Sequence, residues 1–133
     1  MPEPQPSQPT SQFQYAVVRV VPDVERGECL NAGVIVLCRP RRFLAARVHL
    51  DEAKLRALAP DADPQTIVPH LAAIERIAAG DPTAGPMAQL GQGERFHWLV
   101  APSSTVIQAS EVHTGLCDDP AVELDHLFER LVG

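Results

Sequence analysis

The stretch YAVVRVVPDVERGECLNAGVIVL, residues 15–37, decides the fold of this chain. Apolar and mostly β-branched runs lie at its two ends, Ala16–Val21 and Val34–Leu37, and such residues are typical of strands. Between them lies an elbow of charged and turn-forming residues, residues 22–33. Strands this apolar need a core on at least one face, so we expect the elbow at the rim of a sheet. Loops that a rigid sheet holds in place often carry binding residues.

Length and composition indicate one soluble globular domain. The chain has 133 residues, of which 45% are hydrophobic and 21% are charged. Its formal net charge of −6 argues against a nucleic-acid binder, which normally carries a basic face. No apolar run approaches the roughly 20 residues of a membrane span, and no basic segment followed by an apolar one opens the sequence. We therefore expect neither a membrane segment nor a secretory signal.

The cysteines indicate the compartment. Cys29, Cys38 and Cys117 are odd in number and form no C-x-x-C pair. This pattern favours reduced thiols over a disulfide framework, so we expect a cytoplasmic protein. A zinc site built from His113 and Cys117 would need further ligands at recognisable spacing, and no second pair is present. We expect no metal and no other cofactor.

The order of the predicted elements indicates the fold class. Residues 1–12 are almost all Pro, Gln, Ser and Thr, which predicts a disordered tail before a domain of residues 13–133. Strands are predicted at residues 16–21, 33–38, 43–50, 96–101 and 105–108. Helices are predicted at residues 52–59, 66–79 and from 120 onwards. This order predicts an α+β domain, with an antiparallel sheet of about four or five strands covered by three helices.

Some details of this prediction concern single positions. We expect residues 16–21 to be a central strand, because they are apolar on both faces except at Arg19. The strand at residues 43–50 has one clean apolar face and is expected to be half-buried. Helix ends are predicted from residue type at Asp51, Gly80 and Asp119.

Three segments give the chain a family resemblance. They are Tyr15-x3-Arg19-Val-Val-Pro-Asp23 with Arg26-Gly-Glu28, then Asn31-x-Gly33-Val, and then Glu94-Arg95-Phe96-His97-Trp98-Leu99 followed by His113-Thr114-Gly115-Leu116. On these residues the chain resembles the small bacterial family catalogued as domain of unknown function 3037, from about Tyr15 to Leu131. The resemblance implies no activity, because the family has no established one. Its members are often encoded beside a kinase-like protein related to the toxin HipA, which implies such a kinase as a candidate protein partner.

The elbow has a functional and a structural interpretation. In the first, Arg19 and Arg26 hold an anion while Asp23 or Glu28 serves as a base or metal ligand. In the second, Asp23 accepts backbone N–H bonds in a turn and the arginines neutralise the neighbouring acids. Asn31 suits a tight turn in either case. Arg19 is the informative residue, since an arginine inside an apolar strand must find a partner or a ligand.

The second half of the chain adds further candidates. If residues 96–101 form a strand, Arg95 and His97 lie on one face while the aromatic residues face the core. His97 could act as an acid or base, or it could simply fill a hydrogen-bonded position. Ser104 lies in a segment that could cradle a phosphate or form a plain turn. His113 and Thr114 precede two acids that could cap the last helix.

Two functions remain open. The leading hypothesis is a non-enzymatic cytoplasmic binding or regulatory module that acts with a protein partner. The alternative is a small enzyme or ligand-binding protein that acts on a phosphorylated or carboxylated metabolite. Convergence of Arg19, Arg26, Arg95 and His113 in one pocket would favour the alternative. The candidate rim comprises Arg19, Asp23, Arg26, Glu28, Asn31, Arg95, His97, Ser104, His113 and Thr114.

Overall fold

Strand β1 (Ser11–Val20) lies at the centre of the sheet in the computed structural model, which describes residues 10–102 and 105–133. It pairs with β2 (Leu30–Cys38) on one side, and with β4 (Ile107–Ala109) and β5 (His113–Cys117) on the other. Strand β3 (Phe43–Val48) adds to β2, so the order is β3-β2-β1-β4 with β5 beside the first half of β1. All these pairings are antiparallel, and β1 is central as predicted.

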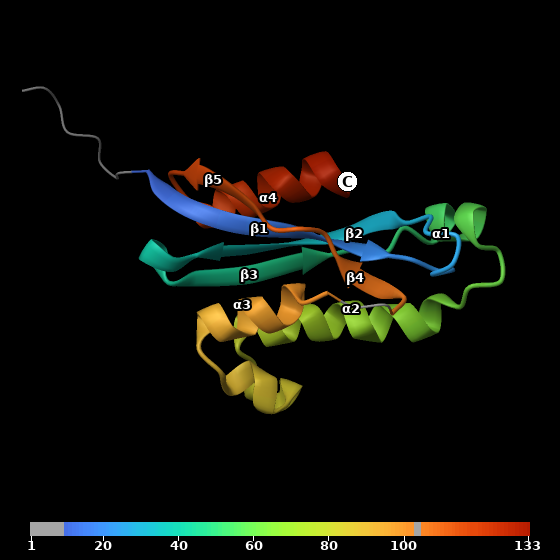
Figure 1. The fold of residues 1–133 in the computed structure, drawn as a ribbon, viewed down its shortest axis with the longest axis horizontal. Helices are drawn as coiled ribbons and strands as arrows, with labels where there is room; N and C mark the ends of the chain where they lie inside the picture. The colour runs from blue at the N-terminus through green and yellow to red at the C-terminus, as the bar shows by residue number, and fades with distance from the viewer. Residues whose placement is uncertain (1–9, 103–104) are drawn as a thin grey trace, which may run out of the picture.

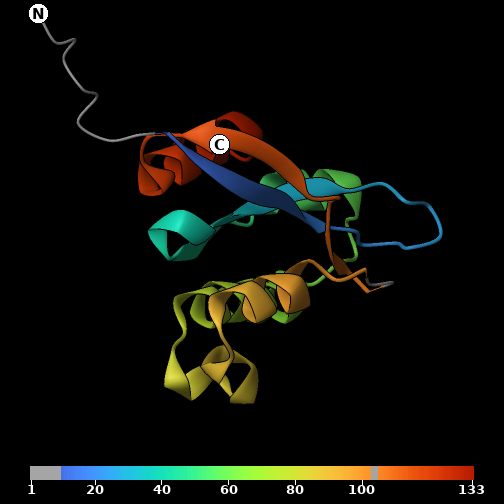
Figure 2. The same ribbon diagram turned by 60° about the vertical axis from the view of Figure 1, so that its left-hand side comes forward.

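Helices cover both faces of the sheet (Figures 1 and 2). Helices α2 (Pro64–Ala79) and α3 (Gln92–Val100) lie on one face, and α4 (Pro120–Leu131) lies on the other. Helix α1 (Glu52–Leu58) follows β3 at the end of the sheet where the elbow lies. Short 3-10 turns are present at Arg39–Arg41, Pro82–Ala84 and Pro86–Gln89. Within the described residues, none of the helices is both long enough and apolar enough to cross a membrane.

The predicted α+β class is confirmed, and two apolar clusters hold its layers together. On the face towards α2 and α3, Val18 of β1 belongs to the same buried cluster as Phe96 of α3. On the face towards α4, Phe13 of β1 and Val34 of β2 cluster with Leu127. Successive residues of a strand point to opposite faces, so the continuous apolar runs of β1 and β2 supply both clusters.

The predicted helix ends are confirmed. Asp51 is the N-cap of α1, and its Oδ1 accepts a hydrogen bond from Lys54 N at 3.1 Å. Asp119 is the N-cap of α4, and its Oδ1 accepts a hydrogen bond from Ala121 N at 2.9 Å. Gly80 follows α2 with φ 73°, in the left-handed region that favours glycine.

The prediction of a strand at residues 96–101 is wrong, because α3 runs through Val100. Phe96, Leu99 and Val100 recur at helical spacing and pack on the α2-side cluster. A short apolar run of this kind cannot be assigned to strand or helix from its periodicity alone. Trp98 was expected to face the core and is instead 48% exposed. The described residues therefore contain four α-helices, one more than predicted.

The polar face of β3 is covered by α4. Arg47 lies 4.1 Å from the centroid of the Phe128 ring, and its Nη1 lies 2.8 Å from Asp125 Oδ1. Leu44 on the opposite face is buried in the α2-side cluster. The guanidinium of Arg47 thus contacts α4 through Phe128 and Asp125, while 42% of the side chain stays exposed to solvent.

The sheet begins earlier and ends later than predicted. Strand β1 starts at Ser11 rather than at Ala16, and Ser11 Oγ accepts a hydrogen bond from Arg41 Nε at 2.9 Å. Ser11 and Gln12 therefore belong to the sheet and not to the predicted tail, whose residues 1–9 lie outside the described residues. Strand β5 was not predicted as a strand.

A single serine joins β4 and β5 along β1. Ser110 N donates to Val17 O at 2.8 Å, and Val17 N donates to Ser110 Oγ at 2.8 Å. The Ser110 hydroxyl in turn donates to Glu111 O at 2.8 Å. Both backbone groups of Val17 therefore stay paired at the point where neither strand lies opposite them.

Gly33 of β2 leaves no room for a side chain. A Cβ at this position would lie 2.8 Å from Arg47 O and 2.8 Å from Val48 Cγ1. We expect Gly33→Ala to lower the free energy of unfolding by about 1–3 kcal/mol in urea denaturation, because β3 must shift. The control is Gly91→Ala, where nothing lies within 4 Å of the added Cβ and the loss should stay below about 1 kcal/mol. Equal losses in the two variants would contradict this account.

Candidate functional site

The predicted rim residues come from different parts of the fold. Arg19 lies on β1 and Asn31 on β2, and the elbow between these strands holds Asp23, Arg26 and Glu28. Helix α3 carries Arg95 and His97, and β5 carries His113 and Thr114. Ser104 lies outside the described residues.

The charged groups of the elbow bind one another and their own backbone. Asp23 Oδ1 accepts from Glu25 N at 3.1 Å and from Arg26 N at 3.4 Å, and Gly27 closes the turn with φ 73°. Arg26 Nη2 lies 2.6 Å from Glu28 Oε1, and this hydrogen bond raises the pKa of the guanidinium. Both side chains of the pair are exposed to solvent, which screens their attraction. These are the contacts that the structural interpretation of the elbow requires.

Arg19 and Asn31 are register partners across β1 and β2, at the irregularity that follows Val18. Asn31 Nδ2 donates to Leu131 O at 3.0 Å, which ties the last turn of α4 to the sheet. Arg19 is half-buried, and no hydrogen bond or ion pair of its guanidinium is found within the described residues. Asn31 therefore has a structural role, while Arg19 can still accept a partner or a ligand.

Arg95 fastens α3 to the end of α2. Its Nη1 donates to Leu90 O at 2.6 Å, and its Nη2 donates to Ala78 O at 3.3 Å. Ala78 lies in the last turn of α2, where carbonyl groups lack a partner within the helix. Gly80 lies beside this contact, and its φ of 73° favours glycine there. Arg95 thus acts as a helix cap from a distant part of the sequence.

We expect Arg95→Met to lower the free energy of unfolding by about 1.5–3 kcal/mol, because it removes charged donors and leaves their carbonyl acceptors unpaired. Urea denaturation measures the effect. The control is Arg56→Met on the exposed face of α1, which should change the free energy by less than about 0.5 kcal/mol. Losses of the same size in both variants would show that Arg95 is an ordinary surface residue.

The two rim histidines lie apart. His97 is exposed on α3. His113 of β5 packs against Tyr15, with ring centroids 5.1 Å apart and planes inclined by 32°, on the face of the sheet that α4 covers. The sheet therefore lies between the His113 side chain and α3, the helix that carries Arg95. Arg26 belongs to the elbow, which lies at the end of the sheet beside α1. Arg26, Arg95 and His113 do not converge on one pocket, and such convergence was the arrangement expected to favour the metabolite-binding alternative.

Two of the three cysteines are buried together. Cys38 and Cys117 belong to the α4-side cluster, whereas Cys29 is exposed. Burial, together with the neighbouring Cys38 thiol, raises the pKa of Cys117 to about 11. The thiolate is the reactive form of cysteine, so Cys117 should be inert at neutral pH. Within the described residues, no three His, Cys, Asp or Glu side chains are placed to hold a metal ion.

A thiol-reactive dye should therefore modify Cys29 alone in the folded protein. We expect one equivalent to react rapidly at mildly alkaline pH, below the raised pKa of Cys117, and all three cysteines to react after denaturation. Dye absorbance counts the equivalents. Cys29→Ser should abolish the rapid reaction, and more than one rapid equivalent in the unaltered protein would contradict the burial of the other two.

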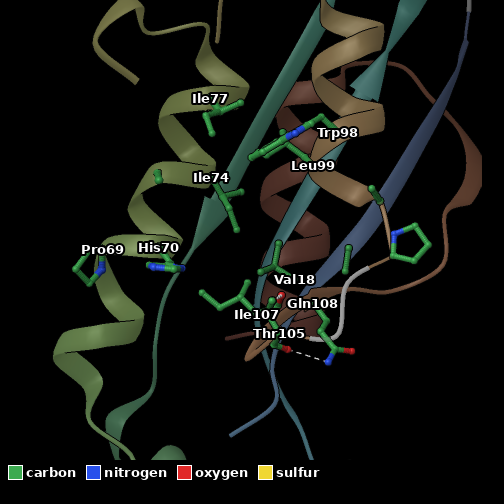
Figure 3. Close-up of a pocket in the computed structure, with 14 residues that line it drawn as sticks. Val18, Pro69, His70, Ile74, Ile77, Trp98, Leu99, Thr105, Ile107 and Gln108 are labelled. Atoms are coloured by element: carbon green, nitrogen blue, oxygen red, sulfur yellow. Dashed lines mark hydrogen bonds between the residues drawn. The ribbon is translucent and has the colours of Figure 1, made fainter. Parts of the chain in front are cut away.

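An apolar groove of about 470 Å³ lies between α2, the end of α3 and β4, and none of the described rim residues lines it (Figure 3). Ile74 and Ile77 of α2 form one wall. Leu99 of α3 and Ile107 of β4 lie opposite, and Val18 of β1 also lines the groove. The groove therefore brings together four elements that are distant in the sequence.

Few polar groups line the apolar groove. Trp98 is one of its lining residues and is 48% exposed, and His70 is the one titratable residue among the described residues of the lining. Gln108 Nε2 donates to Thr105 O at 2.8 Å. None of the described lining residues is Asp, Glu, Lys or Arg. Such a surface suits an apolar, uncharged group, because a charged one would lose its hydration without gaining a partner.

The apolar groove could not be predicted together with a strand at residues 96–101, because it depends on α3 being a helix. A strand places Trp98 and Phe96 on the same core face, whereas a helix separates them by about 200°. The helical spacing of Phe96, Leu99 and Val100 was the signal for this arrangement. It would have left Trp98 as an exposed aromatic residue that needed an explanation.

A family model matches most of the chain. It is described as Protein of unknown function (DUF3037) and matches residues 15–132. No curated protein and no solved structure matches the chain. The matched range contains all four α-helices and every strand except the first residues of β1.

Proposed function

We propose that this chain, which belongs to the family described as Protein of unknown function (DUF3037), is a non-enzymatic binding or regulatory module of the cytoplasm. It engages a protein partner through the apolar groove. The partner we propose is a kinase related to HipA, because members of the family that this chain resembles are often encoded beside such a kinase.

The exposed Trp98 carries this proposal. A tryptophan buries a large apolar area when it is covered, and it is enriched among the residues that dominate binding energy at interfaces. The volume of the apolar groove lies within the roughly 300–1,000 Å³ of ligand sites, yet no Lys or Arg is among its described lining residues to bind an anionic metabolite. Apolar side chains of a protein partner fit this lining better.

Trp98→Ala should weaken binding of the purified HipA-related kinase by about 30-fold, the loss expected when a central interface tryptophan is truncated. Titration calorimetry with the two purified proteins measures the affinity. Because Trp98 is half-exposed, the substitution should leave the thermal melting temperature nearly unchanged.

Leu116→Ala is the matched control. Leu116 is 70% exposed on β5, away from the apolar groove, so its truncation removes a similar kind of surface elsewhere. The kinase should bind this variant with unaltered affinity. Equal weakening by both substitutions, or full affinity of Trp98→Ala, would refute the groove as the binding surface.

A further inference from the structure

We infer that the apolar groove binds the proline-rich segment MPEPQPSQP, residues 1–9, donated by a second copy of the chain. The inference rests on the proposed function, since it concerns the same groove. It adds a regulator to that function, because the segment and the protein partner would compete. The composition of the segment, the hydrogen-bonding groups of the groove and the length of chain available all support it.

The composition of the segment suits the groove. Four of the nine residues are proline, and Glu3 is the one charged side chain. Proline-rich segments adopt an extended helix with little entropy left to lose, and they dock into grooves that present aromatic side chains. Trp98 presents such a ring, and Pro69 and Pro102 also line the groove.

The hydrogen-bonding groups of the groove also match. Thr105 O and Ile107 O already accept bonds from Gln108 Nε2 and Thr105 Oγ1, each at 2.8 Å. No hydrogen bond of Trp98 Nε1 or of the His70 ring is found within the described residues, so both remain donors. A proline offers carbonyl acceptors but has no N–H of its own to satisfy. The carbonyl groups of a proline-rich segment can therefore accept hydrogen bonds from the Trp98 and His70 donors of the groove.

The length of the segment favours exchange between copies. From Ser11 to Val18, the residue of β1 that lines the groove, the strand extends about 24 Å at ~3.4 Å per residue. Any nine-residue segment spans about 28 Å when it is an extended proline helix. Running back along β1 would consume nearly the whole segment before it entered the groove. A second copy is free of this constraint, and two copies exchanging segments form a closed symmetric dimer.

A fluorescence titration tests the contact directly. Trp98 is the single tryptophan of the chain, so its emission reports occupation of the groove. A variant lacking residues 1–9 retains every strand and helix that the structure describes, since these lie within Ser11–Leu131. A synthetic peptide of residues 1–10 should shift the emission of this variant saturably to shorter wavelength. A peptide with alanine in place of each proline should bind at least about tenfold more weakly. No shift, or equal affinities, would overturn the inference.

Two complementary variants test the exchange. Ala73→Arg in the full chain places a charged side chain in the groove but keeps residues 1–9, whereas the deletion variant keeps the groove and lacks the segment. By light scattering each variant alone should be monomeric, and their mixture should form a complex of one copy of each. Should Ala73→Arg fail to fold in a thermal melt, Trp98→Ala takes its place. A mixture that stays monomeric would overturn the exchange.

The outcomes separate this inference from the proposed function. If the deletion variant binds the HipA-related kinase in a Trp98-dependent way but binds neither peptide, only the inference is overturned. If it binds the proline peptide but not the kinase, the proposed partner is wrong and the inference stands. If it binds both, the kinase should bind the deletion variant several-fold more tightly than the full chain, because the competing segment is gone.

Discussion

The backbone of β1 needs hydrogen-bond partners on both of its edges, because helices cover both faces of the sheet at this strand. The β2 hairpin satisfies one edge with residues close in sequence. The other edge is paired by β4 and β5, which come much later in the sequence. Helices α2 and α3 lie between β3 and β4 in the sequence and pack on one face of the sheet. Helix α4 follows β5 and packs on the other face. The three layers are thus a consequence of how one strand completes its pairing.

Features controlled by neighbouring residues could be predicted from the sequence. The apolar runs of β1 and β2, the cap at Asp51 and the glycine at Gly80 all act over a few positions. The short run around Phe96 could not be assigned in this way, since a strand and a buried helix turn look alike over so few residues. What decided it was long-range packing of α3 against α2 and the sheet, including the contact of Arg95 with Ala78 O.

The candidate site shows the same limit. The pairing of Arg26 with Glu28 spans two positions and was foreseen as one of two interpretations. Nothing near Arg95 in the sequence indicates that its acceptors are carbonyl groups of Ala78 and Leu90. The apolar groove is still harder to predict from the sequence, because no single lining residue indicates a binding surface by itself. Only the placement of α2, α3 and β4 beside one another makes them a surface.

Along this edge of β1, Ser110 bridges two separate short strands, β4 and β5. Strand β4 has only three residues, so few hydrogen bonds hold this wall of the groove, and a side-chain hydroxyl stands where a continuous ladder would join it to β5. Short edge segments open locally at a lower free energy than the whole domain unfolds. A ligand that binds only the closed groove must therefore slow amide exchange at Gln108 and Ser110, whose N–H groups point towards β1, while leaving β5 unaffected. Occupancy of the groove and local stability of this edge are then one linked equilibrium.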